Sequence, residues 1–455
     1  MFFCSRLIVP DRLFSVDLHS IRAAIAMASL FGGLFRNFDF LRLWTAQGLS
    51  VLGSKLSELA IPLIAVTMLD ATPVQMGLLL AAENLPFLLI GLPAGVWVDR
   101  MRKRPIMVSA DAVRAVCLIA IPICAYFEVL SLPVLFAVAF GVGFMNVWFD
   151  LAYGSYVPAL VPRDRLIEAN SKLSISLSAA ETCGPAVGGG LIQLFGAPAA
   201  ILFNALTFVF SGLLLGGIKR KEDAPPPPEP GESLRKTIGQ GLRFIWNDLL
   251  MRALTARLAG WHFVVAAMEA LLIIYLTRTL EITPSVIGIL FSVAGIGVLI
   301  GAALGERIPQ RVGTGNTVSL SHLVLALVAL LIPLAQGPKW VQLAMVGFAM
   351  FTWGFCAVTY QITNVSLRQA LAPEGMLARI NAATRFASLG IRPVSAIIGG
   401  YLGAYLGLRN AIWIILSIGL VLAIRGLMSR RVRELVDLPE QRTAQVDAPV
   451  AETAS

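Results

Sequence analysis

The stretch TPVQMGLL at residues 72–79 has a counterpart later in the chain, TPSVIGIL at residues 283–290. A second pair follows the same pattern, because LVPRDRLIEAN at residues 160–170 corresponds to LAPEGMLARIN at residues 371–381. An offset of 211 residues separates the members of both pairs. Two separate stretches rarely share one offset by chance. The sequence therefore predicts that the chain contains two copies of one structural unit in parallel orientation.

The composition predicts a membrane protein. Of the 455 residues, 57% are hydrophobic and 14% are charged, and the mean hydropathy is +0.78. Soluble domains do not have this composition. The apolar runs are continuous and long enough to cross a hydrocarbon core of roughly 30 Å, so helices are indicated rather than the alternating strands of a barrel. The fold class is an all-α polytopic membrane protein with twelve spans, at residues 41–69, 74–98, 106–126, 132–155, 172–195, 198–218, 252–278, 285–306, 317–336, 340–362, 380–405 and 410–429.

A polar break divides these spans six and six. Residues 219–235, KRKEDAPPPPEPGESLR, replace the apolar pattern with charge and four consecutive prolines, which is typical of a stiff linker. Parallel repeats of this kind place a substrate site between the halves near the bilayer midplane. The predicted organisation is an N-terminal extension (1–37), a six-helix half (38–218), a cytoplasmic linker (219–250), a second six-helix half (251–430) and a tail (431–455).

The loop charges predict that both termini are cytoplasmic. With the amino terminus inside, the short inner loops carry eleven Lys and Arg residues and the outer loops carry three. This asymmetry follows the positive-inside rule. It also attributes the net charge of +9 to the membrane surface rather than to nucleic acid. The inner cations are Arg100, Arg102, Lys103, Arg104, Arg163, Arg165, Lys172, Arg307, Arg311, Arg368 and Arg379, and the outer ones are Arg278, Lys339 and Arg409.

Catalytic, metal and cofactor motifs do not emerge from the sequence. The five cysteines are scattered and odd in number, without metal-ligand spacing or a disulfide framework. No GxxxxGK[ST] phosphate-binding loop occurs, so ATP is not expected to supply energy. We expect neither an enzyme nor a cofactor.

The stretch GVWVDRMRKRP at residues 95–105 resembles the loop between the second and third helices of the major facilitator superfamily. The matching residues are Gly95, Asp99, Arg100, Lys103 and Arg104, whereas Arg102 replaces the usual second glycine. The resemblance implies a cytoplasmic latch between the halves, with Asp99 facing the start of the eleventh helix, where a helix amino terminus attracts a carboxylate. The corresponding GAALGERIPQR at residues 301–311 lacks the Asp-Arg pair, so we expect a one-sided latch.

A second motif lies in the fifth span. AAETCGPAVGGG at residues 179–190 is similar to the core of the motif associated with proton-coupled exporters of this superfamily, through Gly184, Pro185, Gly188 and Gly189. Proline bends the helix and frees a carbonyl, and the glycines permit close helix contact. Ordinary packing of small residues is the alternative interpretation.

The stretch at residues 149–170, FDLAYGSYVPALVPRDRLIEAN, most resembles bacterial drug and siderophore exporters, including macrolide efflux and enterobactin exporters. The resemblance implies a monomeric, proton-coupled multidrug or siderophore antiporter in the bacterial inner membrane, surrounded by lipid and acting on amphipathic small molecules. An arginine that many drug antiporters carry in the fourth span is absent from residues 132–148, which leaves the proton route open. The alternatives are an uptake permease or lipid flippase of the same fold, and a receptor or scaffold that does not transport.

Ionisable residues inside the spans are the proton and substrate candidates. Each costs at least about 2.5–3.5 kcal/mol at the bilayer centre unless it is paired or hydrated. Glu83, Glu181, Glu269 and Arg392 lie near mid-depth, and Glu58 is three residues after Lys55, with which it forms a local pair or takes part in transport. Because burial favours the protonated carboxyl, at least one of Glu181 and Glu269 is predicted to load the coupling proton.

The depths of Glu83 and Arg392 predict that they pair. At 1.5 Å rise per residue, both lie about 12–13 Å below the outer surface of the membrane. The second and eleventh helices are neighbours in the superfamily, so a Glu83–Arg392 pair is expected in at least one conformation. The alternative is that Arg392 bonds backbone carbonyls freed by Pro393 while Glu83 stays protonated.

Overall fold

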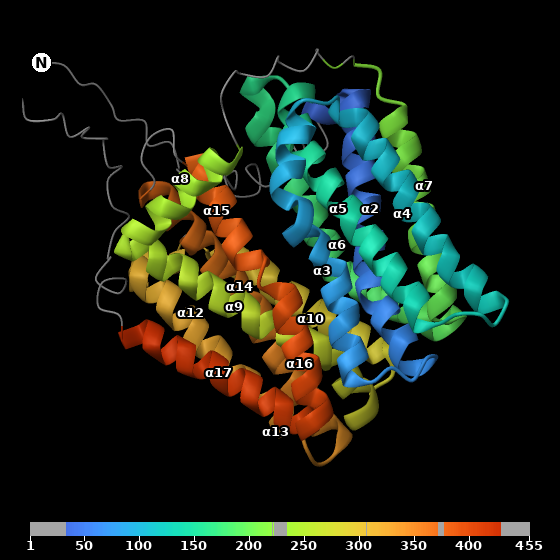
Figure 1. The fold of residues 1–455 in the computed structure, drawn as a ribbon, viewed down its shortest axis with the longest axis vertical. Coiled ribbons are helices and arrows are strands. Elements are labelled where there is room, and N and C mark those ends of the chain that lie inside the picture. Colours follow the sequence, from blue (N-terminus) through green and yellow to red (C-terminus); the bar gives the residue numbers. More distant parts are fainter. Residues whose placement is uncertain (1–32, 221, 223–233, 306, 372–376, 429–455) are drawn as a thin grey trace, which may run out of the picture.

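The computed structural model describes residues 33–220, 222, 234–305, 307–371 and 377–428, and all regular structure in these ranges is helical (Figure 1). The N-terminal extension before residue 33, the prolines of the linker and the C-terminal tail lie outside the described residues. The long helices are α2 (Phe38–Thr67), α3 (Pro73–Asp99), α4 (Lys103–Tyr126), α5 (Leu132–Leu160), α6 (Leu166–Phe195), α7 (Ala197–Gly216), α8 (Leu234–Asn247), α9 (Leu249–Ile274), α10 (Pro284–Leu304), α12 (Thr314–Ala329), α14 (Lys339–Leu371), α15 (Leu377–Leu389), α16 (Arg392–Leu406) and α17 (Leu408–Met428). The shorter ones are η1 (Gly33–Arg36), η2 (Arg163–Arg165), the π-helical η3 (Tyr275–Thr279), α11 (Arg307–Val312) and α13 (Leu331–Leu334).

The repeated Thr-Pro pairs begin two equivalent helices. Thr72 is the N-cap of α3, where its side chain accepts from Gln75 N and Gln75 Oε1 accepts from Thr72 N, which forms a capping box. Thr283 holds the N-cap position of α10. Pro73 and Pro284 then stand in the first turn, where a missing N–H costs nothing. The sequence repeat therefore records a repeated helix start.

Eleven helical segments among the described residues are long and apolar enough to cross a membrane. The predicted span at residues 172–195 lies in α6, which has 30 residues but is not one of these eleven. Glu181, Gln193 and a series of small residues lower its hydropathy. The same small residues permit close packing of α6 against α2 and α10.

Two predicted spans are divided in the structure. The span at 380–405 consists of α15 and α16, with Gly390 and Ile391 between them. The span at 317–336 consists of α12 and α13, with Leu330 between them. Each break comes shortly before a proline, Pro393 or Pro333, which cannot donate a helical hydrogen bond and disfavours the α conformation of the preceding residue.

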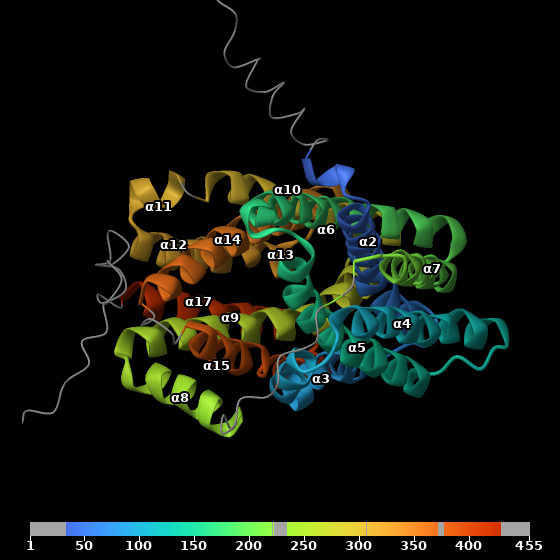
Figure 2. The ribbon, with the colours of Figure 1, turned by 90° about the horizontal axis from the view of Figure 1, so that it is seen from above.

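The helices pack in two groups (Figure 1). In the first group, α2, α3, α4, α5, α6 and α7 contact one another, and in the second, α9, α10, α12, α14, α16 and α17 do so. The main contacts between the groups are α6 with α10 and α3 with α16. Figure 2 shows these contacts on opposite sides of the boundary, with α6 beside α10 and α3 close to α15. Any site between the groups is therefore flanked by α3, α6, α10 and α16.

Candidate functional site

Two pairs of glycines join the groups of helices at one end of the boundary. A Cβ on Gly189 of α6 would lie 3.0 Å from Gly288 Cα of α10, and one on Gly400 of α16 would lie 3.2 Å from Gly77 Cα of α3. Gly77 and Gly288 are 211 residues apart, as are Gly189 and Gly400. The two contacts are therefore related by the offset of the sequence repeat. Only residues without a side chain allow backbones to approach this closely.

An ion pair also joins the two groups of helices at the same end of the boundary. Arg278 of η3 donates to Asp70 Oδ1 at 2.6 Å and to Val66 O at 3.2 Å, so it connects the second group to the end of α2. Arg278 is one of the three cations predicted for the outer loops, whereas Asp70 was not among the candidate residues. The only sequence signal for these residues was their position at or just beyond the ends of the apolar runs. The contact between Asp70 and Arg278 of η3 is seen only in the tertiary structure.

Arg392 makes the central polar contact between the groups. It stands at the first position of α16, directly after the break that follows α15. Its Nε donates to Asn84 Oδ1 of α3 at 3.0 Å, and its terminal nitrogen donates to Glu269 Oε2 of α9 at 2.7 Å. The predicted Glu83–Arg392 pair is not formed in this conformation, in which the neighbouring Asn84 makes the contact instead. Arg392 lies beside α3, as its depth in the membrane predicted, but depth alone does not distinguish Glu83 from Asn84 or reveal the contact with α9.

A cavity of about 80 Å³ lies beside this contact. It is lined by three carboxyl side chains from three helices, Glu58 of α2, Glu83 of α3 and Glu269 of α9. Their side chains are not sealed off, since Glu58 is 52% exposed and Glu269 is 41% exposed. Water-sized space therefore reaches acidic groups in the interior of the bundle. The other polar members of the lining are Ser54, Ser57, Asn146 and Asn204.

The carboxyls at this cavity outnumber their cations. Lys55 Nζ lies 2.9 Å from Glu58 Oε2, which confirms the local pair, and Arg392 neutralises Glu269. Glu83 has no ion pair or side-chain hydrogen bond within the described part of the chain. A carboxylate without a partner is costly in the membrane interior, and taking up a proton removes that cost. At least one of these carboxyls can therefore bind a proton, and how tightly it binds the proton depends on the surrounding charges.

Comparison with known proteins identifies the family. Residues 29–453 match the family described as transmembrane secretion effectors. The chain belongs to this family of major facilitator superfamily transporters. Its relatives include the MFS-type transporter YfiS of Bacillus subtilis, 27% identical over 409 residues that cover 88% of this chain and 95% of YfiS. The enterobactin exporter EntS of Escherichia coli is 25% identical over 371 residues, 80% of this chain and 85% of EntS.

Solved transporter structures have the same fold. The nucleoside transporter NupG aligns with a TM-score of 0.71 at 12% identity, over 86% of this chain and 99% of NupG. A bacterial homologue of the iron transporter ferroportin in an inward-facing state gives 0.67 at 15% identity, over 88% and 100%. A bacterial homologue of the lysosomal transporter Spinster, inward-facing and unoccupied, gives 0.66 at 14% identity, over 89% and 98%. These likenesses show the fold of the transporter.

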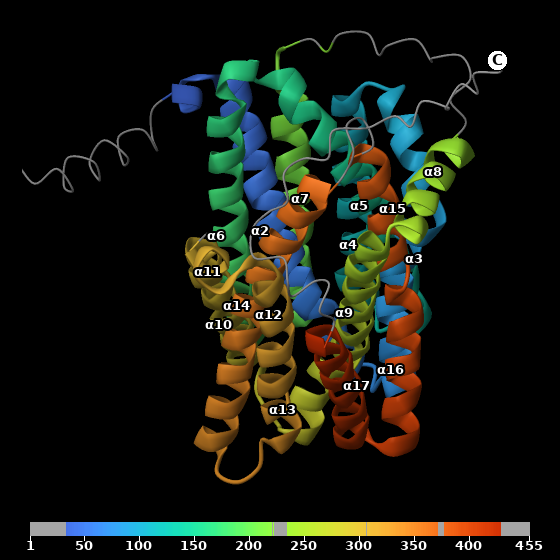
Figure 3. The same cartoon turned by 90° about the vertical axis from the view of Figure 1, so that its left-hand side faces the viewer.

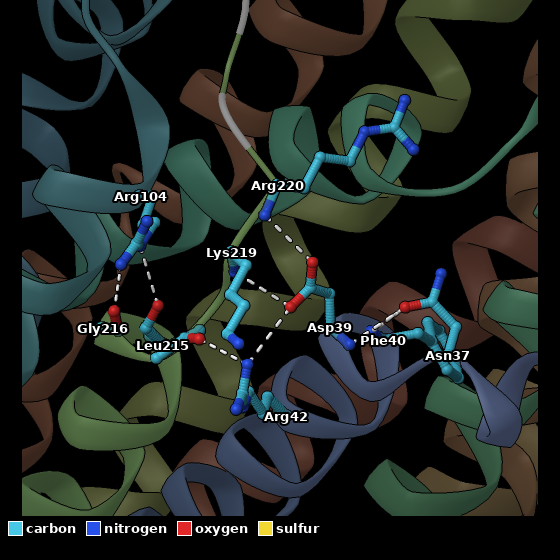
Figure 4. A network of polar contacts seen from close by, with 10 residues as sticks. Asn37, Asp39, Phe40, Arg42, Arg104, Leu215, Gly216, Lys219 and Arg220 are labelled. Carbon is cyan, nitrogen blue, oxygen red and sulfur yellow. Dashed lines mark hydrogen bonds and ion pairs between the residues drawn. The ribbon is translucent and has the colours of Figure 1, made fainter.

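The residues of the predicted latch are divided between two environments. Arg104 donates to the carbonyls of Leu215 and Gly216 at the end of α7, where a cation is favourable to the helix dipole (Figure 4). Lys103 Nζ donates to the carbonyls of Asp99 and Met101 at 3.0 and 2.9 Å. The Asp99 carboxylate makes no hydrogen bond or ion pair with any described residue. Gly95 has no neighbouring atom within 4 Å of an added Cβ, so its substitution meets no steric obstacle here.

The start of α2 holds the same end of α7. Asp39 accepts from the backbone N of Lys219 at 2.9 Å and of Arg220 at 3.0 Å, and Arg42 donates to Gly217 O (Figure 4). Asn37 caps α2 by accepting from Asp39 N and Phe40 N. Arg104 therefore belongs to a network that binds α2, α4 and α7 together, a positioning role that its place in the motif did not predict.

The residues of the predicted helix 5 motif lie where α6 meets its neighbours. Gly184 and Gly188 face α2, where added Cβ atoms would lie 2.8 Å from Lys55 Cβ and 3.3 Å from Leu56 Cα. Gly189 faces α10, and the carbonyl of Pro185 lies against Gly288 of the same helix. The motif thus includes one half of a contact between the groups. Glu181, one turn earlier, does not line the cavity that contains Glu58, Glu83 and Glu269.

Proposed function

We propose that this transporter is a proton-coupled exporter of amphipathic small molecules that works by alternating access. Its twelve spans would comprise the eleven apolar segments and α6, arranged as six-helix halves at residues 38–218 and 251–430. The chain would act as a monomer in the bacterial inner membrane, with both termini in the cytoplasm. The glycine contacts at the repeat offset support this symmetry, because each half supplies one early and one late glycine at equivalent positions.

The contacts in this conformation support its assignment as the state that is open to the cytoplasm. Under the proposed orientation, the glycine pairs and the Asp70–Arg278 pair lie at the outer end, so they close the site from outside. At the opposite end, Asp99 has no partner among the described residues. The latch would form when the outer contacts separate and the inner ends of α3 and α15 approach, which gives each conformation its own set of contacts between the halves.

The contact of Arg392 with both Glu269 and Asn84 carries the proposed coupling. Glu269 and Arg392 belong to one half, and Asn84 belongs to the other. A proton on Glu269 would cancel its charge and release the Arg392 guanidinium, which could then move toward Glu83. Because Glu83 is adjacent to Asn84, this movement requires no change in helix register. Glu269 is favoured over Glu181 as the coupling acid because it lines the cavity and binds Arg392.

Relatives named enterobactin exporters support export of an amphipathic small molecule. The acidic cavity of about 80 Å³ is far below the roughly 300 Å³ of small-molecule sites, so we assign it to proton binding rather than to the substrate. The test uses energised inside-out vesicles that contain the transporter, supplied with a macrolide or a catechol siderophore. Export predicts accumulation inside the vesicles that a protonophore abolishes. Empty vesicles without the transporter control for passive partitioning of the compound.

The alternatives give different results in matched preparations. An uptake permease would accumulate substrate in right-side-out vesicles instead. A lipid flippase would move a fluorescent phospholipid between leaflets without accumulating either compound. A receptor or scaffold would leave all three measurements at the level of empty vesicles, which would contradict the proposal.

A further inference from the structure

A second cavity lies apart from the Arg392 site, within the second group of helices. It has a volume of about 270 Å³ and is enclosed by α9, α12 and α17. This is near the lower limit of roughly 300 Å³ for small-molecule sites. Figure 3 shows α12 and α17 in front of α9 on an outer face of the bundle. Leu422 lines the cavity and is 42% exposed, so the cavity opens toward the face that lipid would surround.

Apart from the imidazole of His322, every polar side chain that lines this cavity is a hydrogen-bond donor. Arg257 donates to Ser319 Oγ at 3.2 Å and to the carbonyl of Gly426, which fixes its guanidinium and leaves further N–H donors. Arg425, in the last turn of α17, has no ion pair or hydrogen bond with the described residues. Within the described part of the chain, no carboxylate lines this cavity. Two positive side chains thus meet at an otherwise apolar cavity.

His322 supplies an independent sign of a missing partner. Its ring stacks on Tyr360, with centroids 3.9 Å apart, and on Trp261, with centroids 5.1 Å apart. Its Nε2 is buried and has no hydrogen-bond partner among the residues that the structure describes. Buried polar atoms are normally paired, and an orphaned one calls for a specific explanation. An acceptor-rich group in the cavity would pair with both arginines beside the His322 ring.

We propose that this cavity binds the phosphate headgroup of an anionic phospholipid, with one acyl chain along its aliphatic wall. Arginine pairs well with phosphate through charge-assisted hydrogen bonds. The lipid-facing opening supplies a path for the acyl chain, and Leu422 at this opening supplies part of its contact surface. The site is independent of the proposed transport direction and of the Arg392 contact.

Native mass spectrometry of the purified full-length protein tests this site with phosphatidylglycerol and phosphatidylcholine. We expect one phosphatidylglycerol to be retained, with affinity about tenfold above phosphatidylcholine. Arg425→Gln should remove most of this preference. Ala256→Leu should weaken both lipids, because Ala256 is an exposed lining residue whose enlargement fills the cavity. Arg311→Gln, an exposed cation on α11 outside the cavity, is the matched control and should bind as the unmodified protein does.

Three results would overturn the proposal. Equal affinity for the two lipids would remove the anionic preference, and unchanged binding by both cavity variants would place the lipid elsewhere. Competition by millimolar inorganic phosphate would show that the site takes the free anion rather than a lipid. Thermal unfolding of each variant verifies that a loss of binding does not come from a loss of fold.

Discussion

Arg392 and Glu269 form an ion pair of 2.7 Å in the interior of the helix bundle, and the same guanidinium donates to Asn84 across the boundary between the groups. The pair with Glu269 connects α16 to α9 and can persist while the groups move as units. The bond to Asn84 must break if α3 and α16 separate. Arg392 therefore links the Glu269 carboxylate, whose charge a proton can neutralise, to a contact that depends on conformation, which is the combination that the proposed coupling requires.

Glu269→Gln is predicted to uncouple transport from the proton gradient. Glutamine still accepts a hydrogen bond from Arg392 but cannot gain or lose a proton, so proton-driven accumulation should fall by about tenfold or more while exchange of substrate down its gradient continues. Accumulation in energised vesicles and unenergised exchange are measured in parallel.

Glu181→Gln is the comparison variant, because Glu181 lies on α6 and does not line the acidic cavity. We expect it to retain most of the coupling. If this variant alone loses coupling, Glu181 rather than Glu269 carries the proton. If both single variants and the double variant still concentrate substrate, neither acid carries the proton.

Charge exchange tests whether Glu83 becomes the partner of Arg392 in another conformation. Glu83→Arg and Arg392→Glu should each abolish efflux, since each leaves like charges or an unpaired charge in the membrane interior. The double exchange should recover part of the activity because it restores one opposite pair. Efflux is compared at equal membrane abundance, with Glu58→Arg combined with Arg392→Glu as the control pair. Recovery only in the control, or none in a well-inserted Glu83 exchange, would contradict the pairing.

Asp99→Asn is predicted to impair cycling without reducing insertion. The Asp99 carboxylate has no partner among the described residues in this conformation, so its removal should cost little here and should destabilise the opposite conformation by about 0.3–2 kcal/mol. Efflux should fall while abundance stays near normal. Arg102→Gln changes an exposed charge of the same loop that is not one of the motif residues, and it should have a smaller effect. Full efflux by a well-expressed Asp99→Asn transporter would show that Asp99 does not act as a latch.

The helical plan was accessible from the sequence because its signals are local. Each continuous apolar run of about 20 residues predicts its own span, and the structure places helices at all twelve predicted spans. The breaks at Gly390 and Leu330 were missed because a proline in an apolar run allows either a bend or an interruption. Neighbouring side chains decide which of the two occurs.

The site was only partly predictable because its contacts join distant helices. The depth of Arg392 along its helix predicted a contact near Glu83. Which of two adjacent residues of α3 it contacts depends on the rotation of the helix about its axis, and that residue is Asn84. Glu269 was recognised as a costly buried acid without its partner. The Asp70–Arg278 pair involves two loop residues that nothing in the sequence links. The glycine contacts could have been anticipated, since the repeat offset relates Gly77 to Gly288 and Gly189 to Gly400, but the offset does not show which glycines touch.

Gly189→Ala is predicted to favour the conformation that is open at the outer end. The added methyl would lie 2.7 Å from Pro284 O and 3.0 Å from Gly288 Cα, which are backbone atoms that cannot turn aside. Overpacking of this kind costs about 1–3 kcal/mol, enough to shift a balance between two conformations by about tenfold or more. The control is Gly190→Ala, one residue further along α6, where no atom lies within 4 Å of the added methyl.

The shift can be measured as access to the cavity from outside. A Ser54→Cys reporter in the cavity lining, in a background with the five natural cysteines replaced by alanine, is labelled in whole cells with a membrane-impermeant maleimide. Labelling should be several times faster with Gly189→Ala and unchanged with Gly190→Ala. Gly400→Ala should act like Gly189→Ala, because its added methyl would lie 2.7 Å from Pro73 O at the equivalent contact. If both contact variants label at the rate of the Gly190 control, the glycine pairs do not close the outer end.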